Sequence, residues 1–159
     1  MLAMAEYGLK DYETASEYFK KYYASYPKGQ YAEMAKYFVG ESLYQNAPEP
    51  RLDQSTTYTA ITAFQEFLDL FPDAHLKAQA TNRLFALQDL LVEKEYKSAR
   101  LYFDMGTYFG NCTNGGNNYE ACIVTAQNAL KDYPYSNKRE EFAKTMRECR
   151  KYSPDLILL

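Results

Sequence analysis

The sequence of 159 residues contains no tryptophan, one histidine and only three cysteines. The single histidine, His75, follows Pro72 at an expected helix start, and no serine or cysteine is placed to form a nucleophilic pair with it. We interpret it as a solvated or capping side chain. The cysteines Cys112, Cys122 and Cys149 are odd in number and lack metal-ligand spacing, so their redox state stays open. We therefore predict a non-enzymatic protein without cofactor or metal.

Long hydrophobic runs and an excess of positive charge are also missing. No stretch approaches the roughly 20 apolar residues of a membrane-spanning helix. Residues 1–10 lack the basic start and apolar centre of a signal peptide, and no cysteine near the start suits lipid attachment. Eighteen Lys and Arg against 21 Asp and Glu give a net charge of -3, which excludes the basic face that nucleic-acid binding needs. We expect neither a membrane span nor a nucleic-acid partner in this chain.

The sequence is rich in amphipathic aromatic residues, with 17 Tyr and 9 Phe. Its hydrophobic share of 47% and charged share of 25% are those of an ordinary globular protein. Tyrosine can fill helix interfaces and still offer a hydroxyl group to a groove. The composition favours one folded domain that binds other molecules.

Three segments of the chain follow one template. Each begins with a small residue and has apolar or bulky residues four and seven positions later. An aromatic residue follows eleven positions after the small residue, and proline follows twelve positions after it. Such spacing predicts a helix with one apolar stripe that stops before the proline. The three stripes are Ala15, Phe19, Tyr22, Tyr26 and Pro27; Ala60, Phe64, Phe67, Phe71 and Pro72; and Cys122, Ala126, Ala129, Tyr133 and Pro134.

A further helical segment precedes each stripe, marked by a small residue with an aromatic residue four positions later. These pairs are Ala3 with Tyr7, Gly40 with Tyr44, and Ala99 with Phe103. Small residues let the two helices of a hairpin approach closely, as in tetratricopeptide repeats. In the second and third units the spacing is lengthened by residues 45–52 and 111–118, which are rich in Pro, Asn and Gly and predict loops.

The pattern predicts an all-α, tetratricopeptide-like α-solenoid of helical hairpins, without strands. We expect one domain over residues 1–152, followed by a tail at 153–159. The expected hairpins cover residues 1–27, 31–72 and 94–134, with a linking helix at 75–92 and a closing helix at 137–152.

The first helices of stacked hairpins line the concave groove of a solenoid, so their aromatic residues are candidates for binding. Aromatic residues at helical spacing otherwise belong to the core. A wall of Tyr, Met and Phe with few charges suits an extended, partly apolar peptide. The candidate groove residues are Met34, Tyr37, Glu41, Tyr44, Tyr96, Arg100 and Phe103.

The order of these motifs resembles the BamD family, the tetratricopeptide lipoproteins of the outer-membrane β-barrel assembly machinery. The aromatic-Pro ends are shared by many tetratricopeptide proteins. More specific is the proline-bearing insertion followed by Asp53, Gln54 and Thr57. The resemblance covers roughly residues 1 to 143 and is not expected to continue beyond.

The resemblance implies a scaffold at the periplasmic face of the outer membrane. In this family a lipid anchor, absent from this chain, tethers the protein, which docks on the barrel subunit BamA and receives unfolded outer-membrane proteins. The insertion at residues 111–118 departs from the family pattern. The alternative is another tetratricopeptide interaction adaptor, either of the cell envelope, like the Tol-Pal-associated coordinator, or of the cytosol.

Overall fold

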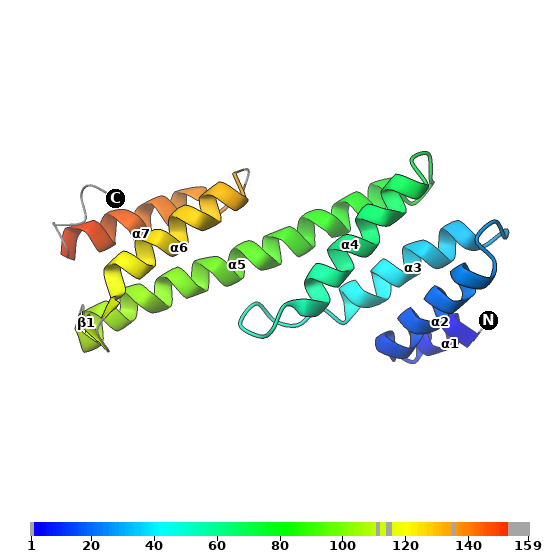
Figure 1. Cartoon of the computed structure of the whole chain (residues 1–159), viewed down its shortest axis with the longest axis horizontal. Coiled ribbons are helices and arrows are strands. Elements are labelled where there is room, and N and C mark those ends of the chain that lie inside the picture. Colours follow the sequence, from blue (N-terminus) through cyan, green and yellow to red (C-terminus); the bar gives the residue numbers. More distant parts are fainter. Residues whose placement is uncertain (1, 111, 114–115, 135, 153–159) are drawn as a thin grey trace. The chain divides into compact units, whose positions relative to one another are not determined.

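The computed structural model describes residues 2–110, 112–113, 116–134 and 136–152, and over these residues the protein is all-α (Figure 1). The predicted tail at 153–159 lies outside the described residues. The helices are α1 (Leu2–Gly8), α2 (Tyr12–Ser25), α3 (Ala32–Gln45), α4 (Ser55–Leu70), α5 (Lys77–Phe109), α6 (Asn118–Asp132) and α7 (Arg139–Tyr152). Two strands of two residues each, β1 (Cys112–Thr113) and β2 (Gly116–Asn117), pair antiparallel within the insertion that we expected to be only a loop.

The chain divides into two compact units, Met1–Gln88 and Asp89–Leu159, where one domain was expected. The boundary falls within α5. The predicted linking helix at 75–92 and the predicted first helix of the third hairpin are parts of this single helix. The physical reason is visible in the sequence, because residues 77–105 contain neither Gly nor Pro that would end a helix between them.

Unit 1 is built from α1 to α4 and the beginning of α5. Consecutive helices pack on one another, so that α2, α3 and α4 lie side by side (Figure 1). The small-residue positions of both stripes, Ala15 and Ala60, are completely buried, as predicted. At Gly40 a Cβ atom would lie 2.9 Å from the Phe64 ring, so only glycine permits this approach of α3 to α4.

A buried glutamine connects the insertion at residues 45–52 to α4. Gln54 is 1% exposed and donates hydrogen bonds to the backbone carbonyls of Glu49 and Leu52. Its amide oxygen accepts the hydroxyl hydrogen bond of Thr57 at 2.7 Å. The expected cap Asp53 accepts from the backbone N–H of Ser55 at 3.2 Å. The motif that follows the insertion therefore fixes the loop to the start of α4.

Unit 2 contains the later part of α5 together with α6 and α7. Its core gathers Ala99 of α5, Ile123 and Ala126 of α6, and Phe142 of α7. The small-residue position of the third stripe, Cys122, is fully buried, as expected. At the start of α6, the Asn117 side chain accepts the backbone N–H of Glu120 and caps the helix.

The aromatic-Pro pairs end the helices as the sequence predicts. Tyr26, Phe71 and Tyr133 are the C-caps of α2, α4 and α6, with φ of -135°, -130° and -127°. Each cap N–H still donates to the carbonyl four residues earlier. The following proline disfavours helical backbone at the residue before it, so all three helices stop at the same point of the template.

The buried Ala60 position yields a stability prediction. Ala60→Leu should lower the free energy of unfolding by about 1 to 3 kcal/mol, because three more carbon atoms must enter a filled contact between α3 and α4. Urea unfolding followed by circular dichroism measures this. Ala24→Leu on the exposed face of α2 is the matched control and should change stability by less than about 0.5 kcal/mol. Equal effects of the two substitutions would mean that the helix register is wrong.

Candidate functional site

A buried carboxylate lies in the interior of unit 1. The Glu41 residue on α3 is 4% exposed. Arg83 on α5 donates two hydrogen bonds to it, from Nε at 3.0 Å and from Nη2 at 2.9 Å. The hydroxyl of Tyr37 donates at 3.0 Å and the amide of Gln45 at 2.9 Å. Four donors therefore satisfy both carboxylate oxygens, which is the condition under which a charge is tolerated in an interior.

The environment of the Glu41 carboxylate shifts the pKa values of two of its hydrogen-bond partners. Burial, followed by the negative charge of Glu41, raises the pKa of Tyr37 from 10.0 to about 12. Burial by itself lowers the pKa of Arg83, but the hydrogen bonds and charge of Glu41 outweigh it and the net direction is upward. The Arg83 guanidinium also stacks on the Tyr44 ring, 4.3 Å from its centroid. The group thus keeps a neutral tyrosine and a charged arginine around one anion.

These contacts change the interpretation of the candidate groove in unit 1. Tyr37 and Glu41 were expected on its wall, but both lie in the interior, where they bond to each other and offer no free surface. Tyr44 is half-buried against Arg83. Met34 is 36% exposed and lines an open cavity. The spacing places these four residues on one helix face, but most of that face packs inward.

Sequence reasoning missed Arg83, although a signal for it exists. The predicted helix places it three residues after Ala80 and four before Leu87, and both of these are buried. A charged residue on such a stripe must find a partner. The chain position of that partner, 42 residues away, cannot be deduced from the spacing.

The other three candidate residues lie in unit 2. Arg100 donates to Glu148 of α7 at 3.0 Å and to Asp104 at 3.3 Å, and its guanidinium lies 4.7 Å from the Phe103 ring centroid. The Tyr96 ring packs edge-on against Phe142. All three candidate side chains are half-buried and hold α5 to α7. They belong to unit 2, whereas Met34, Tyr37, Glu41 and Tyr44 belong to unit 1.

An apolar cavity of about 480 Å³ opens on unit 1 between α1, α2 and α3. Its rim is unusually apolar for an exposed surface, since Leu2 is 59%, Met4 42% and Tyr31 53% exposed. Only Met34 of this cavity was among the predicted site residues. Its lining residues are Leu2, Ala3, Met4, Tyr18, Phe19, Tyr22, Tyr31, Met34 and Ala35.

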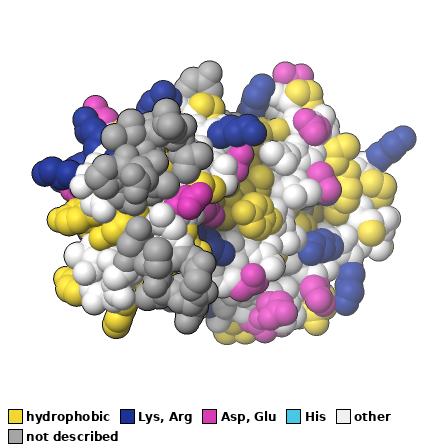
Figure 2. Space-filling model, turned by 60° about the vertical axis from the view of Figure 1, so that its left-hand side comes forward, with side chains coloured by type: hydrophobic (Ala, Val, Ile, Leu, Met, Phe, Trp, Pro, Cys, Tyr) yellow, Lys and Arg dark blue, Asp and Glu magenta, His cyan; other side chains and the backbone are white. Residues whose placement is uncertain are grey.

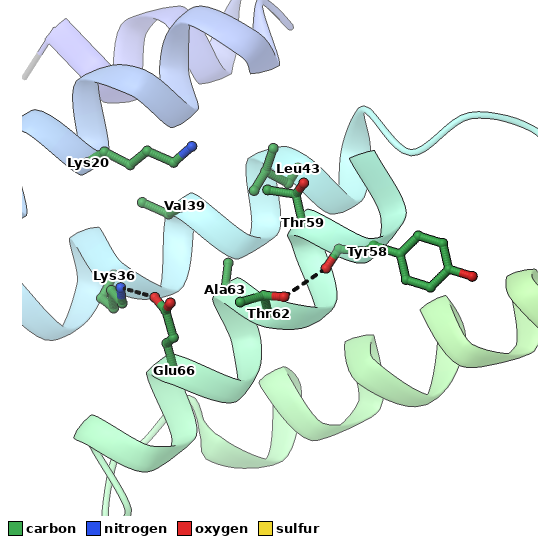
Figure 3. Close-up of a pocket in the computed structure, with 9 residues that line it drawn as sticks. All are labelled: Lys20, Lys36, Val39, Leu43, Tyr58, Thr59, Thr62, Ala63 and Glu66. Carbon is green, nitrogen blue, oxygen red and sulfur yellow. Dashed lines mark hydrogen bonds and ion pairs between the residues drawn. The ribbon is translucent and has the colours of Figure 1, made fainter. Parts of the chain in front are cut away.

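A second cavity of about 500 Å³ lies where α2, α3 and α4 meet (Figure 3). Its lining is mixed, with Val39 and Leu43 beside threonines and the Lys36–Glu66 ion pair, whose nitrogen and oxygen lie 2.7 Å apart. Tyr58 points away from the other labelled residues and is 56% exposed (Figure 3). This cavity has a salt bridge across it and less apolar surface, so it is the weaker candidate for an apolar ligand.

On the face that Figure 2 presents, charges of both signs occur among the described residues. Figure 2 shows acidic and basic side chains interspersed among hydrophobic ones on that face. Among the residues that the structure describes, no cluster of three potential metal ligands occurs. In the same residues, no helix is both long and apolar enough to cross a bilayer.

The Glu41–Arg83 pair makes a second stability prediction. Arg83→Met should lower the free energy of unfolding by about 3 kcal/mol, the low end for a buried pair because the arginine side chain is 37% exposed. The double variant Glu41→Met with Arg83→Met should lose less than the sum of the single changes. Lys36→Met, which breaks the more exposed pair with Glu66, is the control and should cost at most about 1 kcal/mol. Strictly additive losses in urea unfolding would show that the pair is not coupled.

Tyr37 makes the stability of the protein depend on alkaline pH. Its folded-state pKa of about 12 exceeds the ordinary 10.0, so the unfolded chain loses the phenol proton first. The contribution is fully present below about pH 10 and is lost as the pH rises through about 12, up to about 2 kcal/mol. Urea unfolding across this window should show a steeper decline for the unmodified chain than for Tyr37→Phe. Parallel declines would contradict the prediction.

Comparison with known proteins places this chain in a family. The model of the YfiO family, described as outer membrane lipoproteins, matches residues 1–151. No curated protein matches the chain. The family match passes residue 143, where the resemblance was expected to end, so it includes nearly all of α7. It therefore covers both compact units. On this match, the chain belongs to the YfiO family of outer membrane lipoproteins.

Proposed function

We propose that this chain is a non-enzymatic scaffold of the BamD type, a component of outer-membrane β-barrel protein assembly and insertion. It binds segments of unfolded outer-membrane proteins and docks on a BamA-like barrel subunit at the periplasmic face of the outer membrane. Membership in an outer membrane lipoprotein family supports protein partners in the cell envelope. The observation that carries the proposal is the apolar cavity between α1, α2 and α3.

The chemistry of this cavity suits an extended apolar segment. Methionine side chains adapt to irregular partners, and tyrosine rings offer a large apolar face with a hydroxyl group that stays hydrated. Met4 and Met34 supply the first property, while Tyr18, Tyr22 and Tyr31 supply the second. A volume of about 480 Å³ accommodates a few side chains of a peptide.

Strands of membrane β-barrels fit these requirements before they are inserted. Such strands alternate apolar and polar residues and carry aromatic residues near their ends. An unfolded strand can place alternate apolar side chains into a cavity while its polar side chains remain in water. The described residues of unit 1 include no β-strand, so recognition within this unit falls to side chains.

The buried Glu41 group is connected to the cavity through a series of aromatic ring contacts. Tyr37 contacts Phe38 and Phe67 edge-on, and Phe38 stacks on Phe19, which lines the cavity. Fixed rings reduce the side-chain freedom that binding would otherwise remove. We infer that the Glu41 group positions the cavity wall and does not itself contact a ligand.

The alternative is another tetratricopeptide-like adaptor, of the Tol-Pal-associated coordinator type or from the cytosol. A pull-down distinguishes the two functions. Tagged chain is used to capture proteins from detergent-solubilised envelopes of its source cells, and the bound proteins are identified by mass spectrometry. Recovery of a BamA-like barrel protein supports the assembly role. Recovery of peptidoglycan-linked or soluble partners alone favours the alternative. A retained metal or chromophore would instead point to a helical enzyme.

The cavity yields a binding prediction. Met34→Asp combined with Tyr31→Ala should weaken binding of a fluorescent peptide copied from a barrel strand by at least about tenfold, because a charge replaces apolar contact. Fluorescence anisotropy measures the affinity, and circular dichroism checks that helical content is unchanged. Both altered side chains are exposed, so folding should survive.

Tyr58→Ala is the matched control, since it removes an exposed aromatic ring from the mixed cavity of the same unit. Its affinity should equal that of the unmodified chain. If the cavity variant binds equally well, the apolar cavity is not the peptide site. Equal weakening by both variants would indicate nonspecific binding to aromatic surface.

A further inference from the structure

Two cysteines of unit 2 face each other in its core. Cys122 lies on α6 and Cys149 on α7, and their Sγ atoms are 2.7 Å apart. Both residues are 0% exposed and both are free thiols. Around them pack Ile123, Ala126 and Phe142 among other core residues. The two helices that carry the thiols are direct packing partners.

We propose that Cys122 and Cys149 are a covalent modification site, which closes to an intramolecular disulfide when the chain folds in the presence of a disulfide oxidant. The distance of 2.7 Å between the two Sγ atoms approaches the roughly 2.05 Å of a covalent S–S bond. The inference uses neither the apolar cavity nor the proposed partners, so it stands apart from the proposed function.

The reaction is thiol–disulfide exchange with a low-molecular-weight or protein disulfide. The Cys149 thiolate attacks one sulfur of the oxidant, forming a mixed disulfide and releasing one thiol. Cys122 then gives up its proton and attacks the Cys149 sulfur, releasing the second thiol. Two S–H bonds of the protein are lost and one S–S bond forms, while the oxidant disulfide is reduced to two thiols.

The electrostatics favour Cys149 as the attacking group. The hydrogen bond that it shares with Cys122 lowers the pKa of the Cys149 thiol, against the opposing effect of burial, and the positive charge of Arg100 adds to the lowering. A larger thiolate fraction speeds attack on a disulfide. Because both sulfur atoms are buried, the oxidant reaches them late in folding or during local opening, when the neighbours that lower the pKa of Cys149 are already in place.

The family supplies a setting in which such a bond persists. Outer membrane lipoproteins belong to the bacterial envelope, and disulfides form and persist in the periplasm. The bond would close a loop of 27 residues within unit 2 and join α6 to α7. Closing such a loop restricts the unfolded chain, so the oxidised unit should unfold at a higher temperature.

The test uses the full chain with Cys112→Ser, which removes the third cysteine and any exchange through it. The protein is unfolded, then refolded either in a mixture of oxidised and reduced glutathione or in a phosphine reductant. Alkylation in denaturant followed by mass spectrometry of peptides should find Cys122 and Cys149 linked in the first sample and alkylated in the second. The linked form should melt about 10 °C higher than the reduced form.

Comparing two redox states of one sequence avoids a variant that fails to fold. Cys112→Ser with Cys149→Ala is the additional control and should show no change in melting temperature between the two refolding conditions. The proposal is overturned if folded protein from the glutathione mixture carries two alkylatable thiols or only glutathione adducts. A linked form that melts at or below the temperature of the reduced form would overturn it equally.

Discussion

The burial of one carboxylate, that of Glu41, sets the arrangement of unit 1. A charge in an interior is tolerated only when donors surround it, so α5 must bring Arg83 to the same place at which α3 brings Tyr37 and Gln45. The arginine in turn needs a cover, which the Tyr44 ring provides. One interaction therefore fixes the position of α5 against α3, and the aromatic contacts of Tyr37 extend that order toward α4.

The two units solve the same packing problem with different side chains. In unit 1 the helices meet through small residues and phenylalanine rings, with the carboxylate group buried among them. In unit 2 the interior holds two thiols, and the ionic contacts Arg100–Glu148 and Lys138–Glu93 lie at half-exposed positions between α5 and the α6–α7 region. Partly exposed ion pairs contribute little free energy, so the unit relies more on its apolar core.

Periodicity in the sequence was sufficient for the all-α class, for the ends of α2, α4 and α6 and for the small-residue contacts, but it divided the single helix α5 into two. The aromatic-Pro template works because proline acts on its neighbour locally, whatever the rest of the chain does. Tyr37 and Glu41 were expected on the wall of the groove, but the structure buries both. A helical period predicts which residues share a face of the helix, but not which neighbouring helix covers that face. The pairs Glu41–Arg83 and Cys122–Cys149 are separated by 42 and 27 residues. Such pairings depend on the register between helices, which no local spacing contains.

This distinction between local and distant information also explains where the proposed binding surface lies. The first-helix aromatics of the second hairpin were the obvious choice for a groove, yet the buried charge draws them inward. The apolar surface between α1, α2 and α3 remains open as a cavity. In a family of outer membrane lipoproteins, an open apolar surface on a rigid helical frame is best explained by protein partners. The buried charge that draws Tyr37 inward is also connected to this cavity, because Tyr37 contacts Phe38, which stacks on Phe19 in the cavity lining.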